Sequence, residues 1–203
     1  LPMKEDLTPE PEDSYGIAKY AIEMELAASK KMFGLDYIIF RPHNVYGERQ
    51  NLGDKYRNVI GIFMNQIMQH KPLTVFGDGK QTRAFSYISD VAPIIARSIH
   101  LPNAYGHIFN IGADKAYTIL ELIYVIAKEM GGAPEITFHE ERSEVKHTAG
   151  DHSKIRQFFG LSTPVPLEEG IRRMAAWARS RGPQENKPFE SIEILRKLPS
   201  AWT

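Results

Sequence analysis

A long helical pattern followed at once by a buried strand most constrains what this chain can fold into. After Asp13 and Ser14, either of which can cap a helix, apolar residues recur at helical spacing until Gly34. Leu35–Arg41 (LDYIIFR) is rich in β-forming residues and is closed by Pro42, which is typical of a buried strand. A helix joined to such a strand by a short turn is half of an α/β unit. The sequence therefore predicts an α/β fold whose sheet is mainly parallel.

The rest of the chain alternates short extended segments with amphipathic helices. Apolar spacing predicts helices over Asn58–His70, Asp90–His100, Thr118–Met130 (capped by Thr118), Ser153–Phe159 and Pro166–Arg181. It predicts strands over Leu73–Phe76, Phe85–Ile88, Ile108–Gly112 and Glu135–His139. The last helix should bury Ile171, Met174, Ala175 and Ala178. The tail after Gly182 carries several apolar residues, so we expect it to dock on the body.

Composition limits the classes of partner. The 203 residues carry 25 basic and 25 acidic side chains, so global charge does not attract nucleic acid or an anionic membrane. Cysteine is absent and no two of the seven histidines have helix-face metal spacing, so no metal is expected. Leu1–Asp6 lacks a signal-peptide core, and the apolar runs, such as Tyr37–Phe40, are too short to cross a membrane. We expect a soluble, cytoplasmic protein.

Tyr15 and Lys19 are the first candidate catalytic residues. They lie four apart at the start of the first helix, so both side chains project from one face. A nearby ammonium group can lower the pKa of a tyrosine from about 10 toward the range of a proton-transfer catalyst. An exposed amphipathic pair is the alternative that this spacing alone leaves open.

Several separate motifs resemble one known family. They are YGIAK (15–19), RPHNVYG (41–47), FGDGKQTRAFSYISDV (76–91), FNIG (109–112), RSEVKHTAGDHSKI (142–155) and PLEEGIRR (166–173). In this order they resemble the extended short-chain dehydrogenase/reductases that act on nucleotide sugars. Within these, the chain is similar to the NAD-dependent epimerase/dehydratase group, and in particular to the UDP-glucose 4-epimerases.

The resemblance implies a fold and a domain division. Residues 1–57 and 84–112 would be the remaining part of a Rossmann-type NAD-binding domain, and residues 58–83 and 113–203 a small α/β nucleotide-sugar-binding domain. Family members begin with a strand, a glycine-rich turn and a helix. No G-x-G-x-x-G motif opens a helix here, and the catalytic serine or threonine that precedes the tyrosine is absent. We therefore expect the C-terminal portion of the family's fold, with weak NAD binding.

The same resemblance assigns the coenzyme side of the reaction. Tyr15 corresponds to the residue that transfers the proton of the sugar 4-hydroxyl, and Lys19 to the residue that holds the nicotinamide ribose. His43 corresponds to a position whose backbone neighbours the nicotinamide, with a loop histidine of no special role as the alternative.

For the nucleotide sugar, the resemblance assigns a diphosphate contact to Asn44, for which a polar turn residue is the alternative, and a clamp to Arg83 and Arg142. Asn58 would border the substrate, and Asn110 would make a further nucleotide contact. The backbone of Thr74, Val75 and Phe76 would contact uracil, and Glu144 the uridine ribose. The spacing between Arg142 and Glu144 is one residue shorter than the R-x-G-[DE] of relatives.

Two functions of different classes follow. The first is an NAD-dependent UDP-glucose/UDP-galactose 4-epimerase that oxidises and re-reduces C4, with a related dehydratase or decarboxylase as a variant. AFSY after Arg83 is closer to epimerases and decarboxylases than the R-D-W of dTDP-glucose dehydratases. The second is a non-catalytic module that binds a nucleotide sugar or dimerises. The resemblance also implies a homodimer built on the first helix, whose apolar stripe should be exposed and seek a partner.

Overall fold

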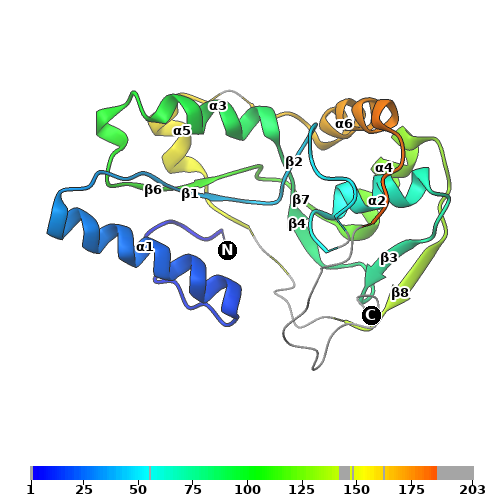
Figure 1. Cartoon of the computed structure of the whole chain (residues 1–203), viewed down its shortest axis with the longest axis horizontal. Coiled ribbons are helices and arrows are strands. Elements are labelled where there is room, and N and C mark those ends of the chain that lie inside the picture. Colours follow the sequence, from blue (N-terminus) through cyan, green and yellow to red (C-terminus); the bar gives the residue numbers. More distant parts are fainter. Residues whose placement is uncertain (1, 55, 142–146, 148, 162, 187–203) are drawn as a thin grey trace.

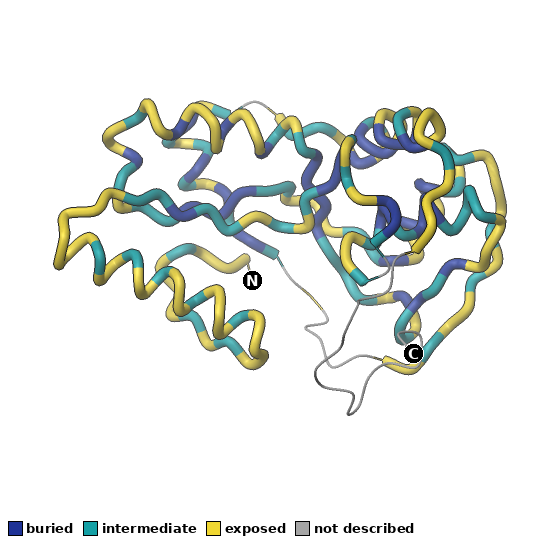
Figure 2. Tube along the Cα trace, in the orientation of Figure 1, coloured by how far each residue is buried: buried dark blue, intermediate teal, exposed yellow. Residues whose placement is uncertain are grey.

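The computed structural model of the chain describes residues 2–54, 56–141, 147, 149–161 and 163–186. Figure 1 shows an elongated molecule, with strands β1 and β6 between helices at one end and a cluster of helices at the other. Each of these two ends is built around its own apolar core. In Figure 2 the helical cluster is dark inside, whereas α1 is mostly exposed.

The first core is built on β1 (Ile39–Pro42) and β6 (Ile108–Ile111), which pair in parallel. Helices α3 (Ile88–Ser98) and α5 (Ser153–Phe159) cover one side of this pair, and α1 (Ser14–Phe33) lies on the other side (Figure 1). The buried members of this core are Val91, Ile94, Ala104, Phe109, Ile111, Ile155 and Phe159. Strand β1 begins at Ile39, four residues later than the predicted start at Leu35, because its pairing with β6 begins there.

Helix α1 begins and ends where its capping residues require. The Asp13 side chain accepts a hydrogen bond from the Gly16 N–H at 2.6 Å, and Gly34 takes a left-handed φ of 72°. No residue of α1 is buried. Its link to the sheet is ionic, because the Arg41 guanidinium donates to both carboxylate oxygens of Glu23, at 2.8 and 2.6 Å.

The second core lies between three helices and one strand. These are α2 (Val59–Met68), α4 (Ile119–Met130), α6 (Leu167–Arg181) and β3 (Leu73–Phe76), with β8 (Ile136–His139) paired to β3. Thr118 and Glu121 form a reciprocal capping box at the start of α4, as the predicted Thr118 cap requires. The predicted inward face of α6 is confirmed, since Ile171, Met174, Ala175 and Ala178 are all buried.

Short strands connect the two cores. They are β2 (Val45–Tyr46), β4 (Thr82–Ala84), β5 (Ser86–Tyr87) and β7 (Ala116–Thr118), and a 3₁₀ turn, η1, covers Pro102–Ala104. The pairs β1–β6, β2–β5 and β3–β8 are parallel, and β4–β7 is antiparallel. The predicted α/β class with parallel strands is therefore confirmed. Strands of two or three residues carry no periodicity, and for this reason β2, β4 and β7 were not predicted.

One further prediction concerns a helix boundary. Helix α3 begins at Ile88, two residues before the predicted Asp90, because the backbone leaves the extended conformation directly after Tyr87.

The tail beyond residue 186 lies outside the described residues, so its predicted docking stays a prediction. The proposed domain division also stays a prediction. Within the described chain, none of the helices combines the length and apolar character needed to span a membrane.

Candidate functional site

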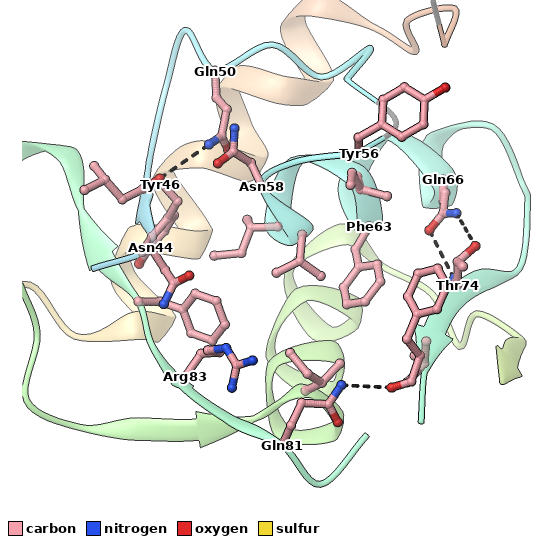
Figure 3. A pocket seen from close by; sticks show the side chains of 18 of the residues that line it. Asn44, Tyr46, Gln50, Tyr56, Asn58, Phe63, Gln66, Thr74, Gln81 and Arg83 are labelled. Carbon is pink, nitrogen blue, oxygen red and sulfur yellow. Dashed lines mark hydrogen bonds between the residues drawn. The ribbon is translucent and has the colours of Figure 1, made fainter. Parts of the chain in front are cut away.

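A cavity of about 310 Å³ lies between α2, β3 and the loop that follows β1. We call it the α2–β3 cavity. Figure 3 shows its side chains converging from these elements and from β4. It is lined by Asn44, Val45, Tyr46, Gln50, Tyr56, Asn58, Val59, Ile60, Ile62, Phe63, Gln66, Thr74, Val75, Phe76, Gln81, Arg83, Phe85, Ile119 and Asn186. Six residues predicted to bind a nucleotide sugar are thus brought together: Asn44, Asn58, Thr74, Val75, Phe76 and Arg83.

Two asparagines of this cavity have backbone conformations that ordinary side chains rarely adopt. Asn44 has a φ of 38° and Asn58 a φ of 66°, both in the left-handed region. The Asn44 amide donates to the Ala84 carbonyl at 2.9 Å, which ties the loop to β4. Asn58 precedes α2 and makes no side-chain capping bond, so its amide is not committed to the helix end. Non-glycine residues in this region cluster at functional sites.

Positive charge and a helix end meet in the same cavity. The half-buried Arg83 projects from β4 among the lining side chains (Figure 3), and one of its nitrogens donates to the Thr82 carbonyl at 2.9 Å. Asn58 and Val59 at the N-terminal end of α2 line the cavity too. The N–H groups and dipole of a helix N-terminus attract anions, as a guanidinium does. The cavity can therefore hold an anionic group at this end.

The strand β3 contributes alternately to core and cavity. Leu73 and Val75 are buried, at 0% and 1% exposure, so Val75 contacts the cavity through a side chain that mainly fills the core. Thr74 and Phe76 are half-buried and line the cavity. This alternation follows from the period of two in a strand.

A second cleft of about 660 Å³ lies between α1 and the N-terminal segment of the chain. Among the predicted residues, Lys19, His43 and Asn110 line it. Tyr15 does not line it; its ring is 70% exposed, and the Lys19 Nζ lies 5.5 Å from the ring centre. The predicted pair is therefore in contact. The Lys19 ammonium group lies over the face of the Tyr15 ring, on an open surface.

Asn110 is committed to internal contacts. Its side-chain amide donates to the carbonyls of Met3 at 2.9 Å and Asp151 at 3.3 Å, and its N–H donates to the Glu5 carboxylate at 2.8 Å. These bonds fasten the N-terminal segment to β6. Arg142 and Glu144 lie outside the described residues, so their predicted contacts remain predictions.

A polar cluster lies at the carboxyl ends of β1 and β6. The His152 ring is 3% exposed, and its Nδ1 lies 2.8 Å from an Asp114 carboxylate oxygen. Arg156 donates to the other oxygen of Asp114. Burial alone would raise the pKa of Asp114, but the hydrogen bonds from His152 and Arg156 outweigh it and lower the pKa. Burial, followed by the neighbouring His152, lowers the pKa of His43 to about 4.

Sequence reasoning missed Gln50, Gln66 and Gln81, whose amides line the α2–β3 cavity. Helical spacing could have found Gln66, because it lies seven residues after Val59 and so on the same face of α2. Nothing local marks Asp114 and His152, which pair across 38 positions. Among the described residues, no group of three or more His, Asp or Glu side chains is arranged to hold a metal ion.

Comparison with known proteins gives the chain its relatives. Residues 1–112, more than half of the chain, match the NAD dependent epimerase/dehydratase family. A UDP-glucose 4-epimerase of Mycolicibacterium smegmatis is 29% identical over 181 residues, which cover 89% of this chain and 57% of that protein.

Solved structures agree. The UDP-glucose 4-epimerase of Thermotoga maritima, determined with UDP-glucose, has a TM-score of 0.80 at 30% identity, covering 89% of this chain and 58% of that one. The UDP-glucuronic acid 4-epimerase of Bacillus cereus, determined with UDP-glucuronic acid and NAD, has a TM-score of 0.80 at 31% identity, covering 87% and 56%. The chain thus spans little more than half the length of these relatives. It belongs to the NAD dependent epimerase/dehydratase family.

Proposed function

We propose that this chain binds the nucleoside diphosphate of a UDP-sugar in the α2–β3 cavity, as part of a UDP-glucose/UDP-galactose-type 4-epimerase. The observation that carries the proposal is that Arg83 and the N-terminal end of α2 line the same cavity. Both favour an anion such as a diphosphate. The remaining lining is aromatic and amide-rich, which suits a nucleobase. UDP-glucose and UDP-glucuronic acid in two similar structures support this ligand class.

The predicted contacts carry over into the proposal. Asn44, Arg83 and Arg142 would hold the diphosphate, Glu144 the ribose, and the edge of β3 at Thr74–Phe76 the base. Asn58 would border the sugar from the start of α2. Asn110 lines the second cleft rather than the α2–β3 cavity, and its amide donates to the Met3 carbonyl, so its predicted nucleotide contact is not part of this proposal.

NAD is the cofactor that the family implies. Lys19 and His43, which share the second cleft, fit its nicotinamide end, and Lys19 would donate to the ribose hydroxyls. When bound, NAD supplies the acceptor and donor of the hydride at the sugar C4. As its phenolate, Tyr15 would take the proton of the sugar 4-hydroxyl, and the resulting hydroxyl would return it after the other face of the sugar is presented. Because the sequence has no G-x-G-x-x-G motif, we expect the 203-residue chain to bind NAD weakly.

One observation favours the second candidate, a non-catalytic binding module. Tyr15 is 70% exposed and lies outside the lining of the cavity that would hold the substrate. General acid–base catalysis requires the catalytic group within hydrogen-bond reach of the proton it moves. We therefore propose that the chain by itself binds UDP-sugars with little or no turnover.

The test is calorimetric titration of the purified chain with UDP, together with an assay for epimerisation of UDP-galactose in the presence of NAD. We expect UDP to bind and turnover to be negligible. Arg83→Gln should weaken binding roughly tenfold or more, because a charge-assisted hydrogen bond is lost. Arg172→Gln, which removes the same charge from an exposed ion pair on α6, is the matched control and should bind as the parent does.

Three outcomes decide between the candidates. Binding without turnover supports the module, and turnover that requires Tyr15 supports a complete catalyst in this chain. No binding of UDP, or equal loss in both arginine variants, would refute the proposed site. A homodimer formed through α1 is part of the same proposal, since the exposed apolar side chains of α1 need a partner.

A further inference from the structure

One edge of β3 faces the α2–β3 cavity rather than another strand. Within the described residues β3 pairs only with β8. The Leu73 N–H donates to the carbonyl of Glu135, just before β8, at 2.8 Å, and the Gly77 N–H donates to the carbonyl of His139 in β8 at 3.0 Å. In a parallel ladder, alternate residues direct their backbone groups to opposite edges. The backbone groups of Thr74 and Phe76 therefore point to the edge that borders the cavity.

Glutamine side chains meet this edge (Figure 3). The Gln66 Nε2 donates to the Thr74 hydroxyl at 2.9 Å, and the Thr74 N–H donates to the Gln66 Oε1 over a long 3.4 Å. Farther along the strand, the Gln81 Nε2 donates to the Phe76 carbonyl at 2.9 Å. A primary amide has two N–H donors and an oxygen with two lone pairs, and the contacts with Thr74 use one of each. Gln66 thus retains one donor and one acceptor for a ligand.

We propose that Gln66, held in place by Thr74, is a specificity-determining residue that selects the nucleobase in this cavity. The inference rests on the proposed function, that a nucleoside diphosphate binds there. An anchored amide beside a strand edge offers a fixed order of donors and acceptors. A planar base whose edge has the complementary order is accepted, and one with a different order leaves polar groups unpaired.

The surroundings make such a mismatch costly. Ile62 and Phe63 of α2 and Phe76 of β3 line the same cavity, so a base that enters it loses water from its polar edge. A polar group that loses water without gaining a partner is penalised, and sites of this kind reject near-isosteric ligands. Gln66 lies on a helix, which holds its backbone more firmly than a loop would.

UDP and CDP are a matched pair of probes. Uracil presents an acceptor, a donor and a second acceptor on its pairing edge, whereas cytosine presents two acceptors and a donor. The two nucleotides have the same size, ribose and diphosphate, so the ratio of the affinities of the chain for UDP and CDP reports only on contacts with the base. We expect the parent chain to prefer UDP by roughly tenfold or more in calorimetric titrations.

Substitutions at Gln66 should change this ratio and leave the phosphate contacts intact. Gln66→Ala should reduce the preference to within about threefold, mainly by weakening UDP. Gln66→Glu replaces the amide donor by an acceptor and should shift the preference toward CDP, whose amino group donates. Thr74→Val keeps the long contact from the backbone N–H but removes the shorter hydroxyl contact that anchors the Gln66 amide, so it should act in the same direction as Gln66→Ala. The double variant should add little to either single one.

The control is Gln157→Ala, on the exposed surface of α5, which should keep the parent's ratio. A Gln66→Ala or Gln66→Glu protein that unfolds thermally like the parent and keeps its UDP/CDP ratio would overturn the inference alone. If the parent binds neither nucleotide, the proposed function fails first and this inference with it. A simple packing role for Gln66 would lower both affinities equally, which would also overturn it.

Discussion

The rings of His43 and His152 meet edge to face, with centroids 5.2 Å apart and planes inclined by 88°. Asp114 anchors His152 from the other side and is itself bound by Arg156. The carboxyl ends of β1 and β6 are thereby joined through side chains as well as through their ladder. His43 lies at one end of this arrangement, next to the imidazole of His152 rather than a carboxylate.

This neighbourhood predicts a pH-dependent stability. His43 has a pKa of about 4 in the folded chain, against an ordinary value of 6.5, so between these values the unfolded chain binds a proton that the folded chain does not. The free energy of unfolding should therefore fall as the pH drops from about 6.5 toward 4, by at most about 3 kcal/mol for this group. Asp114, whose pKa is lowered, stays charged across most of this range.

Urea unfolding at pH 7 and pH 5 measures the effect. His43→Asn should lose less stability between the two pH values than the parent does. His100→Asn, at an exposed histidine after α3, should behave like the parent. Equal pH dependence in the parent and in His43→Asn would contradict the role given to His43.

The left-handed backbone at Asn58 allows its conformation to be separated from its chemistry. Asn58→Gly should leave the free energy of unfolding unchanged or slightly higher, because glycine adopts a φ of 66° without strain. Asn58→Ala should lose about 1 kcal/mol, the cost of a side chain in this region. Both should weaken UDP binding if the amide contacts the ligand. Asn103→Ala, on the exposed η1 turn, is the control and should change neither the stability nor UDP binding. If Asn58→Gly binds UDP as the parent does, Asn58 does not contact the ligand.

A glycine of α6 should tolerate no side chain. A Cβ on Gly170 would lie 2.1 Å from the Tyr46 hydroxyl and 3.1 Å from the Tyr87 ring, in the middle of the second core. Gly170→Ala should therefore destabilise the chain by about 1–3 kcal/mol, although alanine favours helices. Adding Tyr46→Phe removes the closest atom and should restore part of the loss. Gly132→Ala has open space around its Cβ and should be neutral in thermal unfolding.

Exposed apolar side chains on α1 predict self-association. Ile17, Met24 and Met32 are 54%, 58% and 69% exposed, and their spacing places them near one face of the helix. Light scattering across a concentration series should find a dimer, and Met24→Glu should shift it toward monomer. Glu25→Gln, at the next residue, serves as the control. A monomer at every concentration would count against the proposed homodimer.

The sequence predicted what local patterns encode. The inward residues of α6 and the Thr118 cap follow from helical periodicity and capping chemistry, which act over a few residues. The pairing of β4 with β7 and the contact of His152 with Asp114 depend on the tertiary fold and left no local signal. Six site residues share one cavity because the tertiary fold brings β3, β4, the loop after β1 and the start of α2 together. Gln66 was missed because a polar residue on a helix face is ordinarily interpreted as solvent-exposed.

Helix α1 is held by the ion pair of Glu23 with Arg41 and by its caps, with no buried side chain of its own. Its amide hydrogens should therefore exchange with solvent through a local opening that leaves both apolar cores intact, much faster than those of α4 or α6. Because screening by salt weakens a partly exposed ion pair, this opening should become more frequent as ionic strength rises. The helix that carries Tyr15 and Lys19 is thus the least protected of the long helices, and a partner that covers it would slow its exchange.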